Sequence, residues 1–181
     1  MPSLAEKAVA LHLALDAAAL EHAFGGALAL AWCTQQPRGT SDIDINVFVA
    51  PSSTTKVLAS LPPEVARTKS DATLLRRHGQ CRLRWETTPV DLFLNTGPFH
   101  REAMTHFHHE PFAGHMVPFL SCADLAVFKA VFDRRRDWAD LEDMVRADSI
   151  DVDSVTAVLA AHLGDDDHRI DQLRALAVEL G

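Results

Sequence analysis

The spacing of apolar residues divides the chain into a mixed first part and a helical last part. After Ser3, which forms a capping-box sequence with Glu6, apolar residues recur at helical spacing to about Leu20. β-branched residues gather between Ile43 and Val49, which predicts a strand. We expect further helices over residues 54–61, 98–109, 122–135, 138–146, 152–162 and 167–180, and strands over residues 82–86, 90–95 and 115–119. The pattern predicts a mixed part in residues 1–120 and a helical region, packed on it, in residues 121–181.

Composition narrows the class of protein. The chain has 181 residues, and 48% of them are hydrophobic, which is ordinary for a globular protein. Its apolar stretches are too short for a membrane span, and we see no signal peptide. Cys33, Cys81 and Cys122 are scattered and odd in number, so they predict neither a metal site nor a disulfide framework. These features favour a cytoplasmic protein without a membrane partner.

Charge is spread unevenly along the chain. The net charge is −8, yet residues 67–84 contain six basic residues and one acid. Residues 137–171 reverse that balance, with eleven acids and two arginines. The middle of the chain could therefore contact a polyanion, whereas the last third would repel it or simply forms a solvated face.

The strongest candidate for chemistry is the pair Asp42 and Asp44. In a strand, residues i and i+2 point to the same face, so these carboxylates stand side by side while Ile43 and Ile45 face the core. Two adjacent carboxylates repel each other unless a cation lies between them, and Mg²⁺ prefers oxygen ligands and substrate phosphates. Taken alone, the pair favours the solvent-exposed face of an edge strand, because Asp-x-Asp is a common tripeptide.

Two other features point to the same place. Gly25 and Gly26 allow a close backbone approach, and a helix beginning at Ala27 would favour an anion there. Asp91 lies within the apolar run 89–94, where a carboxylate needs a partner or a metal. If the strand of Asp91 neighbours that of Asp44, three carboxylates converge.

The sequence resembles the polymerase-beta-like nucleotidyltransferase superfamily. The resemblance rests on a pair of glycines, an Asp-x-Asp sequence on a strand and a third aspartate on a later strand. The stretches 24–32 and 37–45 look most like the AbiEii-type branch of this superfamily, which contains toxins of toxin–antitoxin systems. A second match runs from Leu120 to Lys129 and then from Arg134 to Asp140. The resemblance implies an α+β minimal nucleotidyltransferase fold with a C-terminal helical part.

The resemblance also implies roles for individual residues. Asp42, Asp44 and Asp91 would be catalytic and would hold two Mg²⁺ ions, or Mn²⁺ in their place. Lys129 would act beside them on the triphosphate of a nucleotide such as ATP. The nucleotide-binding set would be Gly25, Gly26, Arg38, Ser41, Lys129, Asp137 and Asp140. Asp137 and Asp140 could orient Lys129 or cap the next helix.

The implied reaction moves a nucleoside monophosphate from a triphosphate to an acceptor hydroxyl. A tRNA 3′ end is the leading acceptor, with a cognate antitoxin as a possible partner, and the basic residues 67–84 give modest support. Alternatives are an antibiotic of the aminoglycoside type, which the acidic last third would suit, or a non-catalytic binding protein. Five histidines between His100 and His115 form a polar loop, an acceptor surface or, less favoured, a zinc site.

Overall fold

The structure is a computed structural model, and it describes residues 1–180. The chain forms two compact units, each made of two segments. Unit 1 contains Met1–Leu28 and Gly39–Leu120, and unit 2 contains Ala29–Arg38 and Ser121–Gly181. The fold class is α+β, as the sequence predicted. The expected division into domains of residues 1–120 and 121–181 stays a prediction, and the structure adds that residues 29–38 group with unit 2.

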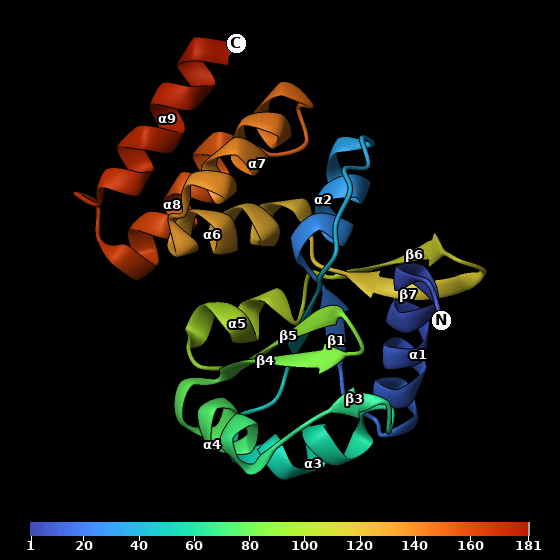
Figure 1. Cartoon of the computed structure of the whole chain (residues 1–181). Helices are drawn as coiled ribbons and strands as arrows, with labels where there is room; N and C mark the ends of the chain where they lie inside the picture. Colours follow the sequence, from blue (N-terminus) through green and yellow to red (C-terminus); the bar gives the residue numbers. More distant parts are fainter. Residues whose placement is uncertain (181) are drawn as a thin grey trace. The chain divides into compact units, whose positions relative to one another are not determined.

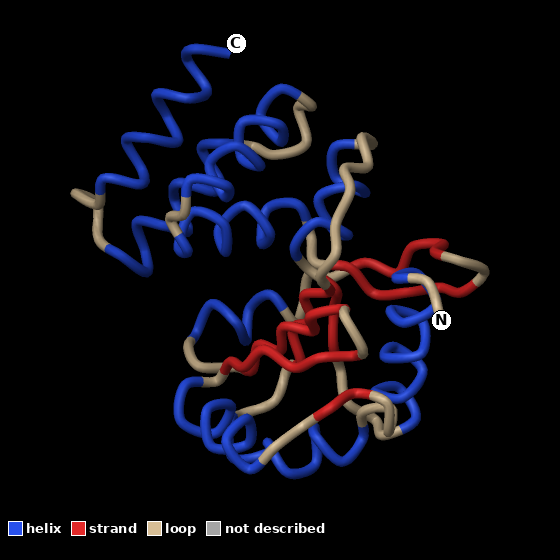
Figure 2. The backbone as a smooth tube through the Cα atoms, in the orientation of Figure 1, coloured by secondary structure: helices blue, strands red, loops and turns tan. Residues whose placement is uncertain are grey.

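Unit 1 is built on one mixed sheet in the strand order β3-β4-β5-β2-β1-β7-β6 (Figures 1 and 2). Strands β2 and β5 pair in parallel near the centre of the sheet, and the other edge of β5 pairs antiparallel with β4. The strands are β1 (His22–Phe24), β2 (Ile43–Val47), β3 (Val65–Ala66), β4 (Gln80–Trp85), β5 (Thr88–Leu94), β6 (His108–Phe112) and β7 (His115–Phe119).

One face of this sheet carries the core of unit 1. Ile43, Ile45 and Val47 are fully buried, as the strand pattern predicted, and Leu83 and Leu92 join them. Helices α3 and α4 lie below strands β3, β4 and β5 in Figure 1. The helical segments of unit 1 are α1 (Leu4–Ala17), the short η1 (Pro51–Ser53), α3 (Thr54–Ser60), α4 (Lys69–His78) and α5 (Pro98–Ala103).

Capping sequences explain where two of these helices begin. The Ser3 hydroxyl accepts a hydrogen bond from the Glu6 amide, and the Glu6 carboxylate accepts one from the Ser3 amide, which completes the expected capping box. Thr68 and Asp71 form the same reciprocal pair at the start of α4. The sequence prediction missed α4 because polar residues dominate that helix.

The segment expected to be one helix over residues 98–109 is only half helical. Helix α5 ends at Ala103, and β6 begins at His108 and pairs with β7 along its length. Ala113 and Gly114 connect β6 to β7, and both have positive φ angles, 47° and 83°, as tight hairpin turns require. The helix prediction was wrong because pairing with β7, rather than any periodicity of its own, makes residues 108–112 a strand.

Unit 2 is helical. It contains most of α2 (Gly26–Thr34), together with α6 (Cys122–Phe132), α7 (Arg135–Arg146), α8 (Val152–Leu163) and α9 (His168–Leu180). Helix α6 packs on α7, α8 and α9, and its core side chains include Leu125 and Ala126. The four helices predicted after Leu120 are therefore present.

A disulfide joins Cys33 in α2 to Cys122 at the start of α6. The expectation that the cysteines form no disulfide was wrong for this pair. The two residues are 89 positions apart in sequence, so their spacing gives no sign that their Cα atoms come within 5.6 Å. Cys81 remains a free, buried thiol. Cytoplasmic location stays a prediction.

Within residues 1–180, no helix has both the length and the apolar character that crossing a membrane requires.

Candidate active site

Asp44 and Asp91 stand level with each other on neighbouring strands. Asp44 on β2 is the register partner of Asp91 on β5 in the parallel pair. Neighbouring strands lie about 5 Å apart, so the two side chains rise together from the same face. That face is opposite to the buried one, because Ile43, Ile45 and Leu92 point into the core. Of the three carboxylates expected to converge, the strand register therefore brings these two level with each other.

Asp42 lies just before β2, on the same side of the chain as Asp44 because they are two positions apart. Thr40 donates a hydrogen bond from its hydroxyl to Asp42 Oδ1 at 2.6 Å. The Asp42 amide donates in return to the Thr40 hydroxyl at 3.4 Å. This local turn fixes the carboxylate before the strand begins. Sequence reasoning did not identify Thr40.

The glycine pair brings backbone against Asp44. The Gly25 amide donates a hydrogen bond to the Asp44 carbonyl at 3.0 Å, and α2 starts at Gly26. Gly26 has a φ of +51°, and a Cβ built on it would lie 1.8 Å from Asp44 Oδ2. Only glycine fits there, so the N-terminus of α2 and a carboxylate share one small space. The close approach predicted for this pair is present.

Arg82 completes the row of charged side chains. It lies on β4 opposite Asp91, its antiparallel register partner. Its guanidinium donates two hydrogen bonds, Nε to Oδ1 at 2.8 Å and Nη2 to Oδ2 at 2.6 Å. These bonds are the first cause of a raised pKa at Arg82, and the charges of Asp42 and Asp44 contribute to the same shift. Four charged groups therefore act on one another across three strands.

Sequence reasoning counted Arg82 only as one of six basic residues. The signal that could have found it is the two-residue turn Glu86–Thr87, because an antiparallel hairpin closed there places residue 82 opposite residue 91. The predicted strands, residues 82–86 and 90–95, instead leave Pro89 in the connection between them, although Pro89 lies inside β5.

The donor set suits Mg²⁺, although its carboxylates do not surround one point. Carboxylates on adjacent strands are the hard oxygen ligands that this ion prefers. Glycine at position 26 keeps open the space beside the Asp44 carboxylate that a Cβ would fill. Among residues 1–180, no group of three or more His, Cys, Asp or Glu side chains is already placed to hold a metal. At Asp91 the physical reason is plain, since Arg82 holds both oxygens.

Unit 2 contains a second group of the predicted residues. Lys129 on α6 is buried, with 6% of its side chain exposed, and its Nζ donates to Asp140 Oδ2 at 2.5 Å. Arg38 donates from Nη2 to the same oxygen at 2.9 Å. Two cations therefore share one carboxylate oxygen. Composition alone would have placed Lys129 on the surface.

Asp137 and Asp140 divide the two roles considered for them. Asp137 accepts from the Arg134 amide and from its guanidinium, so it caps α7, and it lies 4.0 Å from Lys129 Nζ. Asp140 makes the shorter contact with Lys129 and orients it. Ser41, also a predicted ligand of the nucleotide, is exposed just before Asp42.

The histidine-rich segment does not place His106 and His109 on one helix. His106 follows α5, while His109 lies in β6. The three-residue spacing of His106 and His109 therefore does not provide two zinc ligands on one helix face.

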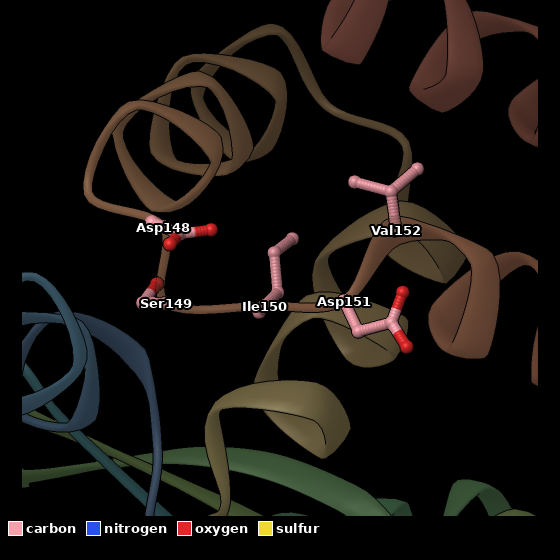
Figure 3. Close-up of a pocket in the computed structure, with 5 residues that line it drawn as sticks. All are labelled: Asp148, Ser149, Ile150, Asp151 and Val152. Carbon is pink, nitrogen blue, oxygen red and sulfur yellow. The ribbon is translucent and has the colours of Figure 1, made fainter. Parts of the chain in front are cut away.

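A surface hollow of about 470 Å³ lies in unit 2, along the segment that connects α7 to α8 (Figure 3). It is lined by one short segment, Asp148, Ser149, Ile150, Asp151 and Val152. The predicted catalytic and nucleotide-binding residues are not part of its lining.

Comparison with known proteins tests the fold directly. No family model matches the sequence, and neither does any curated protein. Solved structures do match. The antibiotic-resistance factor ANT(2'')-Ia aligns with 94% of this chain and 89% of its own, at 14% identity and a TM-score of 0.55. An antigenic nucleotidyltransferase-like protein from Paracoccidioides brasiliensis aligns with 91% of both chains, at 18% identity and a TM-score of 0.51. The chain has a nucleotidyltransferase-like fold.

JHP933 from Helicobacter pylori is also similar, at 17% identity and a TM-score of 0.50, and it covers 100% of this chain and 90% of its own. At such identities the likeness concerns the nucleotidyltransferase-like fold alone. The narrower resemblance to the AbiEii-type branch, and the role of each site residue, stay predictions.

Proposed function

We propose that this protein is a metal-dependent nucleotidyltransferase, which moves a nucleoside monophosphate from a nucleoside triphosphate to an acceptor hydroxyl. The observation that carries the proposal is the level pair Asp44 and Asp91 on adjacent strands, with Asp42 just before them. The nucleotidyltransferase-like fold supports the same reaction class.

Each part of the site has a task in this reaction. Asp42 and Asp44 would hold Mg²⁺, and Asp91 would hold a second ion and accept the proton of the acceptor hydroxyl. When bound, such ions would supply positive charge that offsets the charge of the phosphates. The hydroxyl oxygen bonds to the α-phosphorus, the bond from that phosphorus to the bridging oxygen breaks, and pyrophosphate leaves. The backbone amide of Gly26, with Ser41, binds the triphosphate, whereas the Gly25 amide is held by the Asp44 carbonyl.

Lys129 and Arg38 are the cations proposed for phosphate charge in unit 2. Asp140 holds the Lys129 ammonium and the Arg38 guanidinium in fixed positions. The two side chains therefore lose little conformational entropy when an anion binds. Asp137 fixes the start of α7, which carries Asp140.

The acceptor we propose is the 3′ end of a tRNA, with a toxin role and a cognate antitoxin as further expectations. Exposed cations in unit 1 support a polyanion: Arg76 and Arg77 at the end of α4, and Arg84 on β4. These side chains belong to the same unit as the carboxylates.

A second acceptor class is an antibiotic of the aminoglycoside type. The observation that favours it is the acidic lining of the hollow in unit 2, where Asp148 and Asp151 could meet a polycation (Figure 3). The structural likeness to an antibiotic-resistance factor points the same way.

The test is transfer of label from α-phosphate-labelled nucleoside triphosphates, each in turn, to total tRNA with Mg²⁺. We expect label on tRNA with the wild type and none with Asp42→Ala. Glu64→Ala, which removes an exposed carboxylate from the same unit, should keep wild-type activity. Label on an aminoglycoside but not on tRNA would reject the tRNA acceptor and keep the reaction class. Absence of transfer to either acceptor, with nucleotide binding retained, would favour a non-catalytic binding protein.

A further inference from the structure

Arg82 stands at the end of a straight row of charges. Asp44, Asp91 and Arg82 are consecutive register partners across β2, β5 and β4, so their side chains rise from one face at successive strand spacings. Of the three, only Arg82 is a cation, and its guanidinium grips Asp91 through both carboxylate oxygens. Such a fork is the strongest geometry available to an arginine and a carboxylate.

The electrostatic task of Arg82 is the one a divalent ion would perform. Carboxylates held level on neighbouring strands repel one another, and a cation beside them offsets that repulsion. Arg82 supplies this positive charge, and Asp42 and Asp44 act on it as well as Asp91. A metal ligand at Asp91 needs at least one oxygen, and both are engaged by Arg82.

The surroundings allow Arg82 to leave. More than half of its side chain is exposed, 56%, against 14% for Asp91. Strand β3 pairs only with Arg84 and Trp85 at the far end of β4, so the guanidinium lies beyond that strand. Release of the fork therefore moves a charge into solvent without breaking the sheet.

We propose that Arg82 is a built-in counter-ion of the carboxylate row, which occupies Asp91 until a divalent cation displaces it. The inference rests on the proposed function, because it assumes that Asp91 binds metal. It predicts that the first ion binds at Asp42 and Asp44. The affinity for a second ion at Asp91 is lower, because that ion must first break the Arg82–Asp91 ion pair. Arg82 is thus a positioning residue, not a catalytic one.

Titration of the full chain with Mn²⁺ alone tests whether a divalent cation displaces Arg82 from Asp91. Electron paramagnetic resonance of the free ion measures how much Mn²⁺ is bound. We expect Arg82→Gln to bind its weaker Mn²⁺ about fivefold more tightly than the wild type, the effect of removing one competing ion pair. Arg84→Gln is the matched control: it removes the same charge from the same strand, two residues on, opposite Pro89. The control should leave Mn²⁺ affinity near the wild-type value.

Two further variants separate the fork from general charge. In Arg82→Gln with Asp91→Asn, the gain should vanish, because the oxygens that Arg82 had occupied no longer form a carboxylate. Arg82→Lys keeps the charge but loses the two-bond fork, so its gain should be intermediate. If Arg82→Gln fails to fold, Arg82→Lys decides the question.

A metal-free measurement gives a readout independent of activity. In EDTA, Arg82→Gln should melt at a lower temperature than Arg84→Gln, because the carboxylates have lost their counter-ion, and Mn²⁺ should remove most of that difference. Equal Mn²⁺ affinity and equal melting in the two variants would overturn the exchange and leave the proposed function standing. A wild-type chain and an Arg82→Gln chain that both bind no Mn²⁺ would overturn the exchange and the proposed metal site together.

Discussion

A side chain at position 26 would collide with the carboxylate of Asp44. The backbone there has a positive φ, and the space that a Cβ would fill is already taken by Oδ2. The identity of this one residue therefore sets how closely the start of α2 approaches a proposed metal ligand.

We predict that Gly26→Ala lowers transfer activity at least tenfold and costs at least about 1 kcal/mol of stability, because strain and collision act together. Gly39→Ala is the control, since a Cβ there meets no heavy atom within 4 Å. Transfer assays and urea unfolding of both variants check this. A Gly26→Ala protein as active as Gly39→Ala would show that the close approach of Gly26 to the Asp44 carboxylate has no role in transfer.

A pair of buried histidines makes stability depend on pH. Nδ1 of His22 lies 2.7 Å from the Leu20 carbonyl, which can only accept, so His22 donates there and accepts at Nε2 from His12 at 3.0 Å. Burial lowers the pKa of His22 to about 4, and burial also lowers that of His12, against the charge of Asp16. Both rings are therefore neutral at pH 7.

Acid should weaken the fold before the carboxylates titrate. Below about pH 6.5 the unfolded chain takes up a proton that His22 in the folded chain does not bind. Stability therefore falls as the pH drops toward 4, by about 2 kcal/mol between pH 7 and pH 5. Urea midpoints at pH 7 and pH 5 measure this loss. His22→Gln, which cannot take up a proton, should show a smaller loss over the same range; an equal loss would assign the effect to other groups.

Residue types alone identified the carboxylates but not their counter-ion. Asp42 and Asp44 were found because period-two spacing places both on one face, and Asp91 because an acid interrupts an apolar strand. The fork from Arg82 depends on where the chain reverses between β4 and β5, which a two-residue turn decides. A shift of that turn by one residue would have placed a different side chain opposite Asp91.

At the scale of elements, Lys7 ties α1 to the β4–β5 hairpin. This lysine is 3% exposed, and its Nζ donates to the Trp85 carbonyl and the Thr88 hydroxyl and pairs with Glu86 at 2.9 Å. Its buried charge is therefore fully used, and no apolar residue could replace those bonds.

We expect Lys7→Met to lower the free energy of unfolding by about 2–3 kcal/mol, because two buried acceptors and Glu86 lose their donor. Lys56→Met removes an exposed lysine from α3 and should cost little. Denaturant titration of both variants compares the costs directly. Similar values for the two would mean that α1 is held by its apolar face alone.

Elements with their own local signals were predictable, and elements made by their partners were not. The helices of unit 2 and the start of α1 have caps or apolar periodicity in their own sequence. Strand β1 has three residues and β3 two, so each is a strand only because a neighbour pairs with it. Strand β6 is partly exposed and lacks alternation, which is why its sequence resembled a helix.

At the scale of the whole molecule, the disulfide is the feature that no local pattern could reveal. It joins residues 89 positions apart, and both ends lie in unit 2. Reduction, or Cys33→Ser with Cys122→Ser, should cost about 2–4 kcal/mol, because the unfolded chain regains the freedom of a long loop.

Thermal melting with and without reductant measures that cost. Cys81→Ser serves as the control, since Cys81 is not bonded, and burial raises the pKa of its thiol to about 12. A melting temperature that does not change when reductant is added would mean that the Cys33–Cys122 disulfide contributes nothing to stability.

The same bond turns a linear chain into a ring with two tails. The ring contains residues 33–122, and with them β2 through β7 and every carboxylate proposed to bind metal. A protease that cuts one exposed loop of this ring opens it without separating the pieces, which stay covalently attached until the cystine is reduced. The proposed metal-binding carboxylates therefore remain part of one covalent molecule after a single break in the backbone.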